Sequence, residues 1–146
     1  MTSAIAFDAD VLIHTGTAAH PIGQRVRRLF DPPLAGERLG SVILLTEVAA
    51  KSLRADPQSA ETHALLEILG RLDLRPLDIP TGHLALSLAV SYGLTAADAA
   101  HLATAVSAGA HQFLTNNRRD FPKSITEIEI IYPEDLPEPQ MSPSSR

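Results

Sequence analysis

The sequence predicts an α/β protein in which a parallel sheet of four or five strands lies between two layers of helices. The chain has 146 residues, of which 45% are hydrophobic, and this size is typical of a single domain with a sizeable core. Short apolar segments alternate with longer segments that carry apolar residues at helical spacing. Such alternation is typical of parallel sheets buried on both faces, so we expect a three-layer α/β/α sandwich.

Five short apolar segments are the expected strands. They are residues 4–7, 41–45, 74–79, 112–115 and 127–132. The first strand stops at Asp8, and residues 11–13 are expected to be a further buried strand segment that leads into a turn or the start of a helix. Pro76 weakens the third strand, because proline cannot donate a hydrogen bond to a neighbouring strand.

Amphipathic segments between the strands are the expected helices. They are residues 21–30, a segment that starts at Thr46, and residues 58–70, 82–92 and 96–108. Gly93 is a plausible left-handed cap for the fourth of these helices. Residues 133–146 contain four prolines and three serines, which predicts a disordered tail, so the folded domain is expected to span residues 1–132.

Composition excludes several classes of protein. The chain has no cysteine, which excludes disulfide frameworks, thiolate nucleophiles, zinc ribbons and iron–sulfur clusters. No apolar run approaches the roughly 18 residues of a membrane span, and no basic region precedes the first apolar stretch, so we expect a cytoplasmic protein without membrane contact. The net charge of −5 argues against a bulk electrostatic grip on nucleic acid, but it is compatible with a nuclease that holds its carboxylates in a metal site.

Polar side chains follow several of the expected strands. Asp8 and Asp10 follow the first strand, Glu47 the second, and residues 115–117 (Thr-Asn-Asn) the fourth. In open parallel sheets, function collects beyond the carboxyl ends of the strands. Two carboxylates within about 4 Å repel by roughly 4 kcal/mol at an effective dielectric constant of 20, so a cluster of them implies a metal, a raised pKa or a basic partner. Oxygen ligands of this kind suit magnesium.

Each acidic residue also has a structural explanation. Asp8 can cap a turn or helix, Asp10 can be a solvated turn residue, and Glu47 can favour the dipole of its helix. Asp98 lies three residues after Thr95, which is the spacing of a capping box. His101 lies one turn beyond Asp98 and is expected to be a packed neighbour rather than a base.

Four segments of the chain resemble the PIN domain family. They are residues 5–13, 45–48, 92–105 and 109–117, and the third is the most specific. Their order and their gaps agree with the family over residues 4–132. The resemblance implies a PIN-like α/β/α fold and a metal-dependent endoribonuclease, of the kind that forms the toxin of VapBC-type toxin–antitoxin pairs.

The resemblance also implies roles for particular residues. Asp8, Glu47 and Asp98 would hold Mg²⁺ or Mn²⁺, and the metal would activate a water that cleaves single-stranded RNA to leave 5′-phosphate and 3′-hydroxyl ends. The remaining implied residues are Asn117 as a weak fourth contributor, Asp10, Thr115 and Asp120 as auxiliary residues, and Arg118, Arg119 and Lys123 as contacts to RNA. A small antitoxin and a second copy of the chain are the protein partners that the resemblance implies.

The chain departs from the family pattern at two positions. Position 10, often Asn in the family, is Asp, and position 117, usually an acid, is Asn. Asp120 can supply the missing acid or can be an ordinary loop residue ahead of Phe121. The loss of the fourth acid leaves open a PIN-like module that binds RNA or a protein with weak or no catalysis.

A more distant alternative is a haloacid-dehalogenase-like phosphatase. Residues 7–12 also resemble the nucleophile motif of those enzymes, in which Asp8 would attack phosphorus and Asp10 would act as the general acid. Thr46 could supply the hydroxyl that such enzymes need. However, the residues after the fourth strand offer no acidic pair, and Glu47 and Asp98 would have no role.

Overall fold

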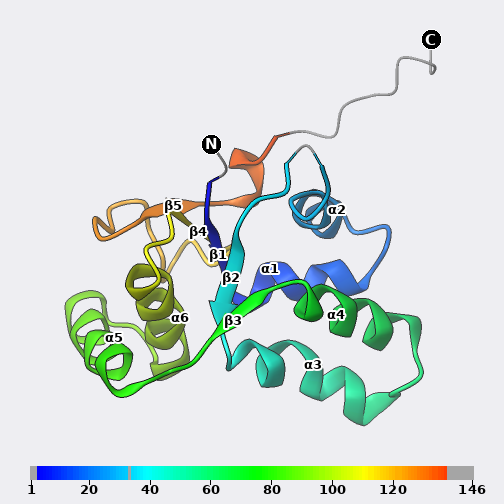
Figure 1. Ribbon diagram of the computed structural model, residues 1–146, viewed down its shortest axis with the longest axis horizontal. Coiled ribbons are helices and arrows are strands. Elements are labelled where there is room, and N and C mark those ends of the chain that lie inside the picture. Colours follow the sequence, from blue (N-terminus) through cyan, green and yellow to red (C-terminus); the bar gives the residue numbers. More distant parts are fainter. Residues whose placement is uncertain (1–2, 33, 138–146) are drawn as a thin grey trace.

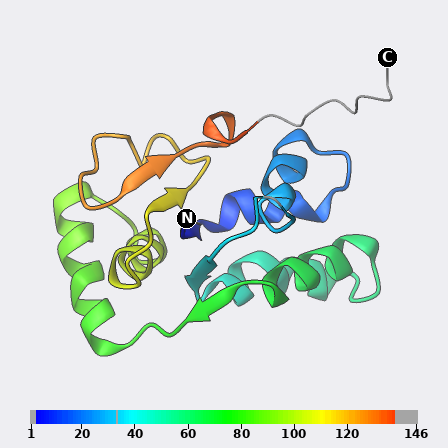
Figure 2. The same cartoon turned by 45° about the horizontal axis from the view of Figure 1, so that its top comes forward.

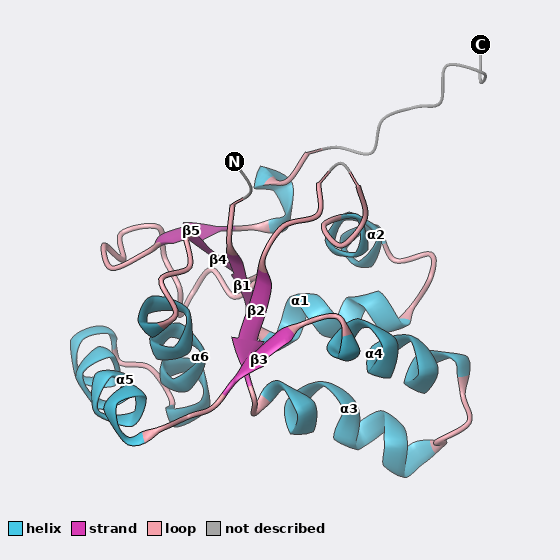
Figure 3. Ribbon diagram, viewed as in Figure 1, coloured by secondary structure: helices cyan, strands magenta, loops and turns pink. Residues whose placement is uncertain are grey.

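Five parallel strands form one sheet in the order β3-β2-β1-β4-β5, in a computed structural model that describes residues 3–32 and 34–137 (Figure 3). The strands are β1 (Ile5–Phe7), β2 (Arg38–Ser41), β3 (Asp73–Arg75), β4 (Gln112–Leu114) and β5 (Glu129–Ile131). The helices are α1 (Ala9–Ile13), α2 (Pro21–Arg28), α3 (Leu44–Ala55), α4 (Ala60–Gly70), α5 (Ile79–Tyr92) and α6 (Ala96–Ser107), with the short 3-10 helices η1 (His14–Gly16) and η2 (Pro133–Asp135).

The sheet lies between two helical layers, as the sequence predicts. Helices α1 to α4 cover one face and α5 and α6 the other (Figure 1). Alternate residues of the strands enter the two cores: Ile5 and Phe7 of β1 pack with α1 to α4, whereas Ala6 packs with α5 and α6. The three-layer α/β/α prediction is therefore confirmed.

The second strand lies earlier than predicted. Of residues 41–45 only Ser41 belongs to a strand, because β2 ends there and α3 begins at Leu44. Arg38, at the start of β2, is a buried charged residue that apolar patterning cannot identify as a strand residue. Its guanidinium donates to the backbone carbonyl oxygens of Leu29 at 2.9 Å and Ser3 at 2.9 Å, which satisfies the buried charge.

Several other boundaries also differ. Residues 11–13 belong to helix α1, and β3 ends at Arg75, directly before Pro76. Thr46 is not a helix cap, because Ile43 precedes the first residue of α3 and makes no side-chain cap hydrogen bond. Gly93 does have the predicted left-handed conformation at the end of α5, with φ of 68°.

The described chain continues past the predicted domain boundary. Pro133–Asp135 form η2, and Leu136 is buried in the core between the sheet and α1 to α4. The two ribbon views agree that η2 lies beside α2 (Figure 2). Of the predicted tail, residues 138–146 lie outside the described residues. Within the described part of the chain, none of the helices has the length and apolar character that a membrane span requires.

Candidate active site

The carboxyl end of the central strand places Asp8 in the interior of the protein. Asp8 follows β1 directly, and its side chain is only 4% exposed. One carboxylate oxygen accepts the backbone N–H of Ala9 at 2.8 Å, which caps α1, and the other accepts the hydroxyl of Thr115 at 2.8 Å. Thr115 follows β4, the neighbouring strand, so the parallel register of β1 and β4 brings the two residues together. Asp8 therefore caps α1 and lies buried at the carboxyl end of the central strand.

Burial raises the pKa of Asp8, and the nearby charge of Asp98 raises it further. The hydroxyl of Thr115 and the charge of His101 act in the opposite direction. Asp98 lies in the first turn of α6, where the hydroxyl of Thr95 caps the helix by accepting the Asp98 backbone N–H. The negative charges of Asp8, which follows β1, and Asp98, which lies in α6, therefore repel each other.

The pKa of Asp98 is also raised, first by burial and then by the negative charges of Asp120 and Glu47. Its hydrogen bond with Thr95 and the charge of His101 lower this pKa. The negative charge of Asp98 therefore interacts with the charges of Asp8, Glu47 and Asp120.

Glu47 is held by a histidine. Its carboxylate, in the first turn of α3, makes a short contact with Nε2 of His101 in α6, and this pair joins the two helical layers. His101 is 2% exposed, and its other ring nitrogen, Nδ1, is buried without a hydrogen-bond partner among the described residues. The contact with Glu47 gives His101 more than the role of packed neighbour expected from the sequence, in which only its spacing from Asp98 places it near the site.

Asp10 lies one residue into α1 and is half-buried. Burial and the neighbouring charge of Asp8 raise the pKa of Asp10 to about 6, although its carboxylate accepts the backbone N–H of Asn116 at 3.1 Å. Asp10, which replaces the Asn that is common at this position in the family, therefore places a second carboxylate beside Asp8.

Asn117 and Asp120 form a reciprocal pair in the loop after β4. The amide of Asn117 donates to the Asp120 carboxylate at 2.9 Å, and its carbonyl oxygen accepts the backbone N–H of Asp120 at 3.2 Å. The backbone N–H of Asn117 in turn donates to the hydroxyl of Thr115 at 3.0 Å. Asn117 thus orients Asp120, whose charge acts on Asp98.

The acidic residues fit a hard divalent cation by their chemistry. All the candidate ligands are carboxylates, and the charges that act on Asp8, Asp10 and Asp98 are those of other carboxylates and of histidines. Burial raises the pKa of Asp8, Asp10 and Asp98, which disfavours their charged forms, and a bound cation would favour those forms. In the arrangement described, no group of three or more histidine, aspartate or glutamate side chains is gathered closely enough to hold a metal ion, within residues 3–32 and 34–137.

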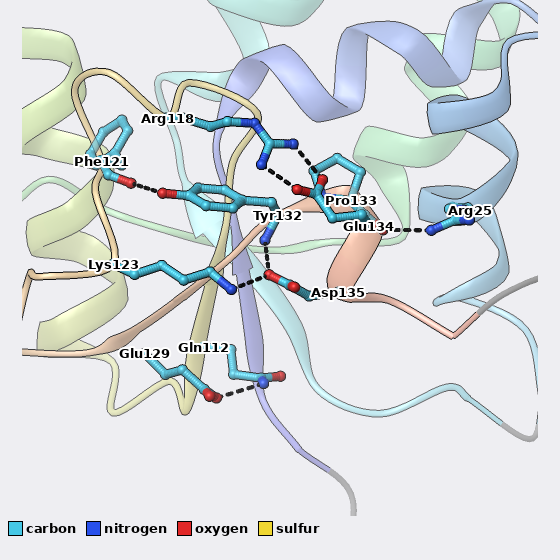
Figure 4. A network of polar contacts seen from close by, with 10 residues as sticks. All are labelled: Arg25, Gln112, Arg118, Phe121, Lys123, Glu129, Tyr132, Pro133, Glu134 and Asp135. Atoms are coloured by element: carbon cyan, nitrogen blue, oxygen red, sulfur yellow. Dashed lines mark hydrogen bonds and ion pairs between the residues drawn. The ribbon is translucent and has the colours of Figure 1, made fainter.

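Two of the three cations predicted to contact RNA are paired with acids of the chain itself. Arg118 contacts both carboxylate oxygens of Glu134, and the ammonium group of Lys123 donates to Asp135 at 2.6 Å (Figure 4). Arg119 is exposed. These pairs are not predictable from the sequence pattern, because Glu134 and Asp135 lie in the segment expected to be a disordered tail.

The family model described as "PIN domain" matches residues 5–124 of the chain. A comparison with curated proteins gives no match. Three solved structures are similar in fold. A toxin–antitoxin complex from Klebsiella pneumoniae has 21% identity and a TM-score of 0.70, and covers 90% of this chain and 98% of its own.

The other two are described as VapBC complexes bound to DNA. The VapBC2 structure from Rickettsia felis, bound to a promoter fragment, has 15% identity and a TM-score of 0.66 over 88% of this chain and 98% of its own. The VapBC structure from Salmonella typhimurium has 20% identity and a TM-score of 0.65 over 91% of this chain and 99% of its own. At these identities the likeness establishes the fold.

Proposed function

Because the chain belongs to the PIN domain family, we propose that it is a divalent-metal-dependent endoribonuclease that cleaves single-stranded RNA. The observation that carries the proposal is the group of acidic residues around Asp98. Burial raises the pKa of Asp8 and of Asp98, and neighbouring carboxylates add to that effect, so a bound cation would stabilise their ionised forms. The family match over residues 5–124 supports the proposal that the cation serves in nuclease chemistry.

Asp8, Glu47 and Asp98 are the residues proposed to hold Mg²⁺ or Mn²⁺. The bound metal would lower the pKa of a water and neutralise the scissile phosphate during attack. Thr115 fixes the orientation of the Asp8 carboxylate through its 2.8 Å hydrogen bond. His101 is a positioning residue, because its contact with Glu47 sets where that carboxylate lies.

We further propose that Asp120 supplies the fourth acid in place of Asn117. The reciprocal hydrogen bonds between these two side chains support this, since they orient Asp120 in the loop from which it acts on Asp98. Asp10 is proposed as a further auxiliary acid. Asp120→Asn is expected to lower cleavage by less than Asp8→Asn does, because Asp120 acts from the loop rather than from the buried strand end.

The direct test is cleavage of a labelled single-stranded RNA with Mn²⁺ or Mg²⁺, and with a chelator. We expect cleavage only with metal, and a loss of at least about 100-fold in Asp8→Asn and Asp98→Asn, since even residues behind the ligands typically contribute 10- to 100-fold. Asp73→Asn is the matched control, because Asp73 is exposed on β3 and pairs with Arg75. RNA binding without metal-dependent cleavage would instead support the alternative of a binding module.

We also propose the role of toxin in a VapBC-type pair, with a small antitoxin and a second copy of the chain as partners. A groove with a volume of about 220 Å³ between α1, α3 and α4 supports an antitoxin site, because it is lined by the exposed Ile13 and extends to Glu47. Co-expression with the neighbouring reading frame tests this. A co-purifying protein that suppresses cleavage is expected, and unchanged activity would reject the toxin role but leave the nuclease chemistry standing.

A further inference from the structure

The segment that follows β5 contacts two of the cations proposed to bind RNA. We call residues 133–136 the C-terminal segment. Its Glu134 carboxylate contacts both terminal nitrogens of Arg118, and its Asp135 carboxylate accepts from Lys123 at 2.6 Å and from the backbone N–H of Tyr132 at 2.9 Å (Figure 4). Two acids in succession therefore neutralise two cations of the loop after β4.

Tyr132 holds those two cations in one place. The Arg118 guanidinium lies 4.4 Å from the centre of the Tyr132 ring and the Lys123 ammonium lies 5.1 Å from it. Figure 4 shows the ring between the two side chains. The ring is itself fixed, because it is buried and its hydroxyl donates to the backbone carbonyl oxygen of Phe121 at 2.8 Å. Both cations therefore lie against the same buried ring.

The contacts resemble those that a nucleic-acid backbone makes. A guanidinium that contacts both oxygens of a carboxylate uses the same parallel N–H groups that it uses for a phosphate. The hydrogen bonds from Arg118 lower the pKa of Glu134 to about 2, and the hydrogen bond to Asp135 raises the pKa of Lys123. Both pairs are therefore fully ionised at neutral pH, with carboxylates where phosphates would bind.

The C-terminal segment also lies next to the acidic site. Arg118 and Glu134 line a cavity of about 250 Å³ together with Arg25 of α2 and with Asn116. The backbone N–H of Asn116 donates to Asp10, which connects the cavity wall to the acidic residues. An RNA strand that reached Arg118 at this cavity would compete with Glu134 for the guanidinium group.

We propose that the C-terminal segment is an internal competitor of RNA, in which Glu134 and Asp135 occupy Arg118 and Lys123 until backbone phosphates displace them. This inference rests on the proposed ribonuclease function, because it takes single-stranded RNA as the ligand. Phosphates can displace Glu134 from Arg118 because the two side chains are 55% and 48% exposed, respectively. Exposed ion pairs also contribute little to stability, so breaking this one costs little. The backbone of the segment stays in place, since Leu136 is buried and Arg25 donates to the carbonyl oxygen of Pro133 at 3.1 Å.

The test is RNA affinity in the full chain with Asp8→Asn, a background in which cleavage is blocked. Adding Glu134→Gln, which keeps the shape of the side chain but removes its charge, should tighten binding of a single-stranded RNA about three- to fivefold. The dependence of log affinity on log salt concentration should steepen by up to about 0.7, which is the slope of one added phosphate contact on a single strand.

Two controls separate competition from a general change of charge. Glu37→Gln also removes one negative charge from an exposed pair, with Arg75, and it should leave affinity and salt slope nearly unchanged. In an Arg118→Gln protein, Glu134→Gln should give no further gain, because the cation that it releases is absent.

The outcomes distinguish this inference from the function on which it rests. If the parent protein binds RNA but Glu134→Gln leaves affinity unchanged, weakens it, or matches Glu37→Gln, the competitor role is wrong and the nuclease proposal is unaffected. If neither the parent nor Glu134→Gln binds RNA, the proposed function fails and this inference fails with it. Thermal unfolding of each variant confirms that the proteins compared are folded.

Discussion

Thr115 is the residue on which the ionised form of Asp8 depends most directly. Its hydroxyl donates to the Asp8 carboxylate at 2.8 Å, and both side chains are buried. Thr115→Val removes that donor without changing the volume of the side chain. We expect a loss of about 1.5–3 kcal/mol in the free energy of unfolding at pH 7.5, the usual contribution of a hydrogen bond to a charged group.

The pH dependence of that loss identifies its cause. Thr115 lowers the pKa of Asp8, so Thr115→Val raises that pKa further, and the loss should be largest where Asp8 is ionised and should shrink as the pH falls. Urea unfolding of metal-free protein at pH 7.5 and pH 5 measures this. Thr115→Ser retains the hydroxyl and serves as the control. Equal losses at both pH values would contradict the assignment.

Asp10 gives a second pH-dependent prediction. Its pKa is about 6 in the folded protein and 3.8 as an unperturbed group, so folding favours its protonated form. Asp10 therefore weakens the fold above pH 6, and this cost disappears as the pH falls from 6 toward 4. Asp10→Asn should raise the Tm of metal-free protein at pH 7.5 by a few degrees and have little effect near pH 4.

The matched control for Asp10→Asn is Asp73→Asn on the exposed edge strand β3. Thermal unfolding across this pH range compares the two variants with the parent chain. An Asp10→Asn protein whose Tm gain is the same at pH 4 and pH 7.5 would show that the charge of Asp10 is not the cause.

At the scale of elements, Gly23 allows α2 to lie against η1. A Cβ atom at position 23 would stand 2.1 Å from the backbone carbonyl oxygen of His14, which cannot move away as a flexible side chain could. Gly23→Ala should therefore destabilise the protein by about 1–3 kcal/mol or more, as overpacking of a core does. Denaturant unfolding measures the change.

Gly82 is the internal comparison for Gly23. It lies within α5, and a Cβ atom there would meet nothing within 4 Å. Gly82→Ala should stabilise the protein by up to about 1 kcal/mol, because alanine is the better helix former. If both substitutions stabilise, the close approach of α2 and η1 does not constrain the fold.

Helices whose apolar residues recur at helical spacing were predictable from the sequence. A strand that contains a buried charged residue, such as β2, was not. The helices at residues 58–70 and 96–108 are found with shifted ends because their apolar spacing and caps are local signals. The strand β2 was misplaced because Arg38 is buried there and is stabilised by carbonyl groups from distant parts of the chain. No local pattern carries that information.

The candidate site shows the same division. Asp8 and Glu47 were candidates because they come after expected strands, and Asp98 and Asp120 because they lie in or near the segments that resemble the PIN domain family. The contact between His101 and Glu47 and the pairing of Arg118 with Glu134 were not predictable, because each joins residues from separate elements.

At the scale of the whole molecule, cation binding should couple to folding. The carboxylates involved come from β1, α3 and α6, so the unfolded chain cannot present them together. At 100 times the dissociation constant, Mn²⁺ or Mg²⁺ should add about 2.7 kcal/mol to the free energy of unfolding. A rise in Tm measured by calorimetry checks this.

The size and specificity of that rise are also predicted. For a chain of this length we expect a Tm increase of roughly 5–10 °C. Asp98→Asn should reduce the increase strongly, whereas Asp73→Asn should leave it intact. A rise that survives Asp98→Asn would place the cation elsewhere.

The pairing of β1 with β4 has a consequence for how the protein is made. The hydrogen bond between Asp8 and Thr115 joins residues 107 positions apart, and the central strand of the sheet cannot pair with β4 until that part of the chain exists. A chain still growing on the ribosome therefore holds Asp8 without its partner until Thr115 has been made. If the protein cleaves RNA and needs this pairing to do so, the nascent chain cannot cleave the messenger that encodes it before that point.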